Sequence, residues 1–181
     1  MAGKLHNLRT EIAVMKRLKH PNLTRLYEVY EAPAMSTSVF LVMDFVDGGP
    51  VMRDADILSG TAEPLSLIEA QNVFKQLMRA LSYLHAHSVL HQDIKPSNVL
   101  RDASTGLVKL SDFGVSSFTN QHKSARVLGE DDVIFVGTCG TPAFMSPEGL
   151  GAGPDNVYHG RPADVWAAGA TLVCLLYGQL P

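Results

Sequence analysis

The stretch His91-Gln92-Asp93-Ile94-Lys95-Pro96-Ser97-Asn98 constrains this chain more than any other, because it holds a base, a cation and a metal ligand at fixed spacing. Asp93 can accept a proton from a hydroxyl, and Lys95 can neutralise charge on a transferring phosphoryl group. Asn98 offers an oxygen of the hard kind that Mg²⁺ prefers, and Asp112, in Asp112-Phe113-Gly114, offers another.

The sequence between these two oxygen ligands predicts a β-hairpin. Val99-Leu100 and Leu107–Leu110 are apolar runs on either side of a polar turn, Asp102–Gly106. A hairpin of this kind brings its two outer ends together. We therefore expect Asn98 and Asp112 to lie close enough to share a metal ion.

The two motifs resemble the catalytic loop and the metal-binding motif of protein kinases. Two further kinase motifs follow in order: Gly140-Thr141-Pro142-Ala143-Phe144-Met145-Ser146-Pro147-Glu148 and Asp164-Val165-Trp166-Ala167-Ala168-Gly169. Within the serine/threonine kinases, the chain is most similar to the calcium/calmodulin-dependent protein kinase kinase branch. The segments that carry this similarity are Glu11-Ile12-Ala13, His20-Pro21-Asn22, Gly49-Pro50-Val51-Met52, Ile94–Asn98 and Gly140–Met145.

The resemblance implies an α+β, protein-kinase-like two-lobe fold that is truncated at both ends. Residues 1–46 would be the remnant of the small lobe and hinge, and residues 47–181 the large lobe up to its central buried helix. The sequence pattern agrees, because β-rich runs give way to helical repeats after Gly48–Pro50. Strands are expected at Leu26–Tyr30 and Val39–Phe45. Helices are expected at Leu5–Lys19, at Met52–Leu58, from the capping box Ser66–Glu69 through Leu84, and at Ala163–Tyr177.

The resemblance also assigns roles to individual residues. Asp93 and Lys95 are the catalytic pair, and Asn98 and Asp112 are the metal ligands. Nucleotide binding falls to Glu11, as partner of a phosphate-binding lysine, to Met43 at the back of the adenine pocket, to the Asp44 and Val46 backbone, and to Leu100. In the activation and substrate segment the matching residues are Thr138, Thr141 and Glu148, and Thr141 is expected to hydrogen-bond Asp93 and Lys95. His91 is expected to pack under the loop, and Asp164 to bond the loop backbone.

The cofactors implied are ATP and Mg²⁺, and the partner is a protein substrate, which in this branch includes another protein kinase. Calmodulin would bind through a region absent from this chain. A net charge of −3 does not indicate a nucleic-acid-binding surface. The longest apolar run, about 13 residues, is too short to span a bilayer. Two cysteines fit a reducing compartment, so a cytoplasmic location is expected.

Three features depart from the kinase pattern. First, no Gly-rich loop and no strand lysine precede Glu11. Second, Gln92 stands where kinases usually have an arginine, just before the catalytic aspartate. Third, the helices expected after Pro181 are missing, and with them the arginine that would pair with Glu148. Two hypotheses follow. The chain is a fragment of an active serine/threonine kinase, or it is a catalytically impaired kinase-like module that works by binding partners.

Two residue sets also have a simpler interpretation. His85, His87 and His91 resemble a zinc-binding set, but Ser88 stands where zinc proteases carry a glutamate, so structural histidines are favoured. Glu11, taken alone, would be a surface glutamate on an amphipathic helix, and only the downstream motifs favour its family role.

Overall fold

The computed structural model describes residues 11–31, 39–118, 134–136, 139–151 and 157–181. Residues 11–17 are helical. The later elements are β1 (Leu26–Glu31), β2 (Val39–Met43), α2 (Asp54–Ser59), α3 (Leu67–Ala86), β3 (Val89–Leu90), η1 (Pro96–Asn98), β4 (Val99–Arg101), β5 (Val108–Leu110), β6 (Ser117–Phe118), β7 (Ile134–Val136), η2 (Pro142–Phe144), β8 (Val157–His159) and α4 (Gly160–Tyr177).

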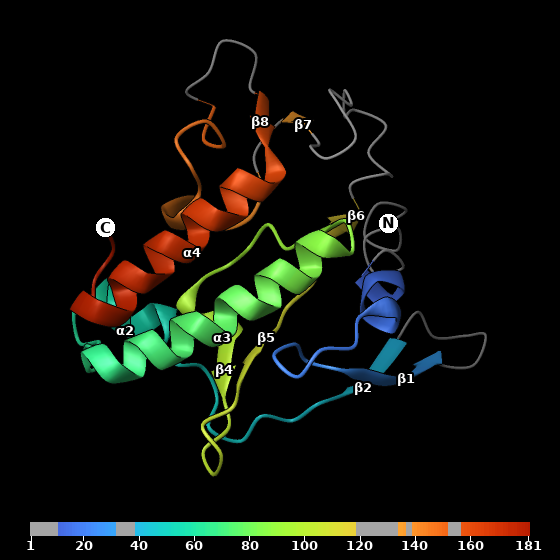
Figure 1. Cartoon of the computed structure of the whole chain (residues 1–181), viewed down its shortest axis with the longest axis horizontal. Helices are drawn as coiled ribbons and strands as arrows, with labels where there is room; N and C mark the ends of the chain where they lie inside the picture. The colour runs from blue at the N-terminus through green and yellow to red at the C-terminus, as the bar shows by residue number, and fades with distance from the viewer. Residues whose placement is uncertain (1–10, 32–38, 119–133, 137–138, 152–156) are drawn as a thin grey trace.

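The described chain has two parts, and the first is a small sheet beside the helix over residues 11–17. β1 and β2 pair antiparallel, with Tyr30 opposite Phe40, so the predicted pairing is confirmed. The helix over 11–17 buries Val14 and Met15 against the core, and it ends before His20-Pro21, as predicted for its described part. Figure 1 shows this sheet and helix on the side of the molecule away from the C-terminus.

The second part is built on two long helices, α3 and α4, which lie side by side and antiparallel (Figure 1). α3 begins with the predicted capping box, because the Ser66 hydroxyl and the Glu69 carboxylate satisfy each other's backbone N–H groups. Its apolar stripe is buried, and it packs with α4 and the β4–β5 hairpin into the main core. The buried stripe consists of Val73, Leu77, Leu81 and Leu84. The α+β, kinase-like arrangement predicted from the sequence is confirmed.

Two helix predictions were wrong in detail. α4 begins at Gly160, three residues before the expected start, and takes Pro162 into its first turn, where proline's missing N–H costs nothing. Only one face of α4 is buried, since Val165 and Trp166 are each 50% exposed. α2 runs from Asp54 to Ser59 rather than from Met52, whose side chain is instead part of the core.

The β4–β5 hairpin forms as predicted and carries the ends of the catalytic motifs. Val99 pairs with Leu110, and the Ser111 N–H donates to the Asn98 carbonyl at 2.9 Å, so Asn98 and Asp112 leave the hairpin at the same end. The turn at the other end is held by the Asp102 carboxylate, which accepts hydrogen bonds from Ser104 and Thr105. These bonds lower the pKa of Asp102 to about 2.

Four other short pairings occur in the described ranges: β3 with β6, β7 with β8, Leu23 with the β5 residue Leu110, and Pro50 with the β4 residue Leu100. No helix in the described ranges is long and apolar enough to cross a membrane.

Candidate active site

The catalytic loop runs from β3 to η1 and contains a backbone conformation that side chains rarely adopt. Gln92 has φ = 67°, and Asp112 has φ = 65°, both in the left-handed region. Such residues cost about 1–3 kcal/mol each and persist only where the surrounding structure holds them. Two of the three non-glycine residues with positive φ in the described ranges therefore lie next to Asp93 and at the expected metal ligand, and the third is Ser88, in the turn before β3.

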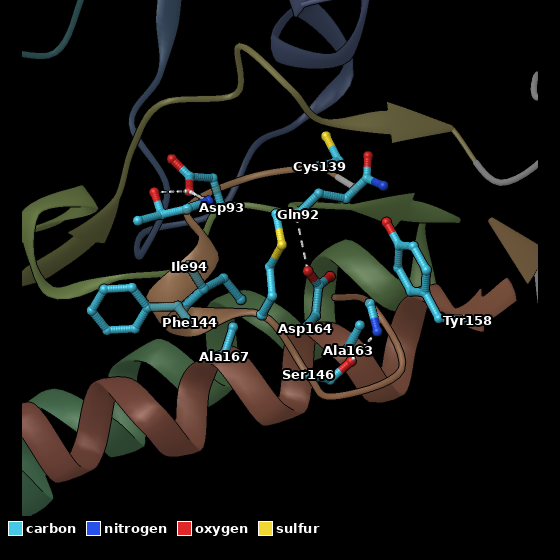
Figure 2. A pocket seen from close by; sticks show the side chains of 14 residues that line it. Gln92, Asp93, Ile94, Cys139, Phe144, Ser146, Tyr158, Ala163, Asp164 and Ala167 are labelled. Carbon is cyan, nitrogen blue, oxygen red and sulfur yellow. Dashed lines mark hydrogen bonds between the residues drawn. The ribbon is translucent and has the colours of Figure 1, made fainter. Parts of the chain in front are cut away.

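Asp164, near the start of α4, is the group that holds the loop. Its side chain is 1% exposed and accepts hydrogen bonds from the backbone N–H groups of His91 (3.0 Å) and Gln92 (2.8 Å). Figure 2 shows the carboxylate pointing from the helix towards the loop. The backbone contact that the kinase resemblance implied for Asp164 is therefore present.

His85 also bonds Asp164, and sequence reasoning missed this contact. Its Nε2 lies 2.9 Å from Oδ2 of Asp164, while the Arg161 guanidinium donates to the His85 carbonyl at 3.2 Å. His87, by contrast, contacts the Tyr83 carbonyl. The rings of His85 and His87, two of the three histidines considered as a zinc set, thus have separate partners. The position of His85 in the last turn of α3 was the only signal available in the sequence.

His91 is completely buried beneath the loop, as expected. Its Nε2 lies 3.1 Å from the Ser111 carbonyl, and its Nδ1 accepts from the Asp93 N–H at 3.3 Å, so the neutral ring with the proton on Nε2 satisfies both contacts. The ring packs edge-on against Phe113 at 5.3 Å. His91 therefore ties the catalytic loop to the segment that carries Asp112.

Burial lowers the pKa of His91 below 6.5, despite the charge of Asp164 and the bond to Ser111, which both act to raise it. The unfolded chain therefore binds a proton first as the pH falls. The contribution of neutral His91 to stability is fully present above pH 6.5 and decreases below it. We expect urea unfolding between pH 7.5 and 5 to show a steeper loss of stability for the wild type than for His91→Gln. Equal slopes would contradict this expectation.

Asp93 lies at the centre of a polar cluster. Its Oδ1 accepts from the Thr141 hydroxyl at 2.7 Å and from the Thr141 N–H at 2.9 Å, and its Oδ2 accepts from the Asn98 amide at 3.1 Å. The Lys95 ammonium lies 3.0 Å from the Thr141 hydroxyl and 3.5 Å from Asp93. The hydrogen bonds expected of Thr141 are thus formed, and a carboxylate and an ammonium group lie together at the loop surface.

The expected metal end of the site is a group of oxygen donors. Asn98 is buried and already donates its amide hydrogens to Asp93, which leaves its oxygen as the group available to a cation. Glu11 and Asp112 both lie beside Gly114, since a Cβ built there would be 3.1 Å from Oδ1 of Asp112 and 4.0 Å from Oε2 of Glu11. Burial first and the charge of Asp112 second raise the pKa of Glu11. Two carboxylates in one place favour a bound cation, so the donor set fits Mg²⁺.

The residues expected to contact the adenine lie at the end of β2, on the connection that leaves it, and on β4. Val46 is buried, whereas Met43 is 37% exposed. Leu100 lies on β4, where it forms a bridge with Pro50 at the end of this connection. Asp44 was expected to act through its backbone alone, but its side chain also accepts hydrogen bonds from Lys109, Tyr27 and the Arg25 backbone.

A pocket lies between the catalytic loop, the segment from Cys139 to Gly149 and α4 (Figure 2). Asp93 is one of the residues that line it, together with a group of apolar side chains. The apolar lining comes from Ile94, Phe144, Met145, Ala163 and Ala167. Gly140 packs so closely on the loop that a Cβ there would lie 2.1 Å from the Gln92 carbonyl oxygen. Glu148 is exposed in the turn that follows, and Thr138 lies outside the described residues.

Comparison with known proteins gives a consistent result. A sequence model described as "Protein kinase domain" matches residues 2–181. "Serine/threonine-protein kinase ssp1" of Schizosaccharomyces pombe is 42% identical over 99% of this chain and 26% of its own length. "CBL-interacting serine/threonine-protein kinase 3" of Arabidopsis thaliana is 40% identical over 96% of this chain and 35% of its length. "Calcium/calmodulin-dependent protein kinase kinase" of Caenorhabditis elegans is 37% identical over 100% of this chain and 30% of its length.

The chain therefore spans between a quarter and a little over a third of the length of these curated relatives. The relatives carry three different kinase names, so they establish the family without selecting a branch. The family match over nearly the whole chain agrees with the loop, the anchoring aspartate and the Asp93 cluster. The chain belongs to the protein kinase family, among the serine/threonine kinases.

Proposed function

We propose that this chain carries the phosphoryl-transfer centre of a serine/threonine protein kinase, which moves the γ-phosphoryl group of ATP to a hydroxyl of a protein substrate. Residues 1–46 contribute the small lobe and hinge, and residues 47–181 the large lobe. The observation that carries the proposal is the Asp93 carboxylate, which is bound to Thr141 and Asn98, with Lys95 3.5 Å away.

In this proposal Asp93 orients the substrate hydroxyl and accepts its proton as the oxygen attacks the phosphorus atom. Lys95 stabilises the negative charge on the phosphoryl oxygens. Asn98 and Asp112 hold Mg²⁺, which neutralises charge on the phosphates when it is bound. Glu11 positions a phosphate-binding lysine. The adenine contacts the backbone of Asp44 and Val46 and the side chains of Met43 and Leu100.

The branch, partners and location are part of the same proposal. Similarity to a relative named as a calcium/calmodulin-dependent protein kinase kinase supports a place in a signalling cascade, with another protein kinase as substrate. Calmodulin would bind through a different segment of a longer protein, and the enzyme would work in the cytoplasm. Glu148 and Thr138 belong to the activation and substrate segment.

A titration with Mg²⁺-ATP tests the proposal. Asp112→Ala is expected to weaken Mg²⁺-ATP binding at least tenfold relative to wild type, because a metal held by few protein oxygens loses one of them. The matched control is Asp102→Asn, at the opposite end of the same hairpin, which is expected to bind like the wild type. Equal affinities for wild type and Asp112→Ala would remove Asp112 from the metal site. A wild type that binds no Mg²⁺-ATP would favour the alternative of a partner-binding module.

Gln92 predicts that activation does not require phosphorylation of the segment after Asp112. Its amide oxygen accepts a hydrogen bond from the Ser117 hydroxyl at 2.8 Å, and a neutral group with a neutral partner needs no phosphate as counter-charge. In a kinase that contains this chain, we expect phosphatase treatment and Thr138→Ala to leave activity within about twofold of the untreated enzyme. Gln92→Arg is expected to make activity sensitive to phosphatase. Loss of wild-type activity after phosphatase treatment would contradict this prediction, and would mean that a cation elsewhere in the protein binds the phosphate.

A further inference from the structure

The shortest ion pair in the described part of the chain is not in the catalytic loop but beside the hinge. The Lys109 ammonium lies 2.7 Å from Oδ2 of Asp44, and both side chains are largely shielded from solvent, at 20% and 14% exposure. By contrast, Arg101 and Glu69 are 3.7 Å apart and nearly half exposed. Partial burial and short distance make the Lys109–Asp44 contact the stronger of the two.

Asp44 accepts further bonds from the small sheet. The Tyr27 hydroxyl donates to its Oδ1 at 2.6 Å, and the Arg25 N–H donates to its Oδ2 at 3.0 Å. The backbone adds another bond, from the Asp44 N–H to the Arg25 carbonyl at 2.9 Å. These bonds, with the Lys109 ammonium, lower the pKa of Asp44 although its burial acts in the opposite direction. Both oxygens of this carboxylate therefore accept hydrogen bonds.

Lys109 connects this cluster to the other end of the site. It lies on β5, three residues before Asp112, and it also donates to the Leu23 carbonyl at 3.4 Å. β5 is further joined to the segment before β1 through the Thr24 N–H, which donates to the Leu110 carbonyl at 3.0 Å. β5, which ends two residues before Asp112, is thus connected to the segment that leads out of β2.

We propose that Lys109 is a positioning residue for nucleotide binding, because its contact with Asp44 holds the backbone at 44–46 in a fixed place relative to Asp112. We call Lys109, Asp44 and Tyr27 the hinge latch. The inference rests on the proposed function, in which that backbone receives the adenine and Asp112 holds the metal on the phosphates. The hinge latch then fixes the distance between the adenine end and the phosphate end of the nucleotide site. The protein therefore loses less conformational entropy when the nucleotide binds.

Hydrogen exchange tests the latch itself, without any ligand. Lys109→Met keeps the aliphatic stem and removes the ammonium, and it is expected to speed amide exchange in the peptide over 39–47 at least tenfold, with α3 and α4 unchanged. The matched control is Arg101→Met, on the neighbouring strand β4. It is expected to change amide exchange in the peptide over 39–47 less than twofold. The double variant Lys109→Met with Asp44→Asn is expected to exchange little faster than Lys109→Met alone. Unchanged exchange in Lys109→Met would overturn the latch.

Calorimetric titration with Mg²⁺-ADP tests the positioning role. We expect Lys109→Met to bind Mg²⁺-ADP about five- to twentyfold more weakly than wild type, and Lys109→Arg, which keeps a cation for the Asp44 carboxylate, to retain most of the wild-type affinity. Faster exchange with unchanged affinity would show that the latch is structural only and would overturn the positioning role. If the wild type binds no Mg²⁺-ADP, the proposed function fails and the role of Lys109 in nucleotide binding fails with it, whereas the exchange data still decide whether the latch exists.

Discussion

Replacing Asp93 with asparagine is expected to slow phosphoryl transfer by about 10²–10⁴-fold in a kinase that contains this chain, the range typical for loss of a general base. Asparagine keeps the shape of the side chain and one acceptor oxygen, so Thr141 can retain its bonds. Its new NH₂ group, however, faces the Asn98 amide and the Lys95 ammonium, which are both donors. The amide can neither accept the substrate proton nor balance the charge of Lys95.

The measurement is single-turnover transfer from radiolabelled ATP to a serine-containing protein substrate, together with Mg²⁺-ATP affinity. We expect affinity to change less than threefold, since Asp93 acts on the hydroxyl rather than on the nucleotide. Glu63→Gln, an exposed carboxylate before α3, is the control and should transfer at the wild-type rate. Turnover of Asp93→Asn at the wild-type rate would refute the catalytic assignment.

Asp164→Ala is expected to destabilise the fold more than any other single substitution at the site, by about 3–5 kcal/mol. The carboxylate is buried and bonds two loop N–H groups and the His85 ring, so its removal leaves three donors without an acceptor. It also releases the strained backbone at Gln92. Because a domain is typically stable by only about 5–15 kcal/mol, this variant should lie close to the unfolding threshold.

Urea unfolding at pH 7.5 measures the effect, and Glu63→Ala is the control for loss of an exposed carboxylate. Asp164→Asn is expected to be intermediate, because it keeps one acceptor oxygen but turns an NH₂ group towards a donor. A loss below about 1 kcal/mol for Asp164→Ala would mean that water or a neighbouring group replaces the carboxylate, and that the loop does not depend on α4.

Features with a local cause could be predicted from the sequence. The capping box at Ser66, the β4–β5 hairpin and the antiparallel β1–β2 pair each follow from neighbouring residues and are all present. The placement of Asp164 under the loop followed from the family resemblance rather than from pattern. Its bond to His85 joins residues 79 positions apart, and no periodicity in either helix indicates it.

Other features depend on contacts that no local pattern encodes. Backbone hydrogen bonds do not depend on side-chain identity, so Asp44 was expected to act through its main chain alone. Its side chain is instead held by Lys109, a residue 65 positions later. The left-handed conformation of Gln92 is likewise imposed by tertiary contacts, because glutamine rarely adopts it, whereas aspartate, at position 112, is one of the residue types enriched in that region. α4 starts at Gly160 rather than at the expected Ala163, because the first turn of a helix tolerates a proline and can therefore contain Pro162.

The small β1–β2 sheet also has a consequence for how the protein behaves in concentrated solution. A two-stranded sheet is only marginally stable by itself, and this one presents Phe40 at 61% and Phe45 at 90% exposure along and just beyond β2. Exposed apolar strands are templates for pairing with other chains. Self-association through strand pairing should therefore begin at this sheet, and a charged residue at Phe45 should raise solubility without disturbing the catalytic loop.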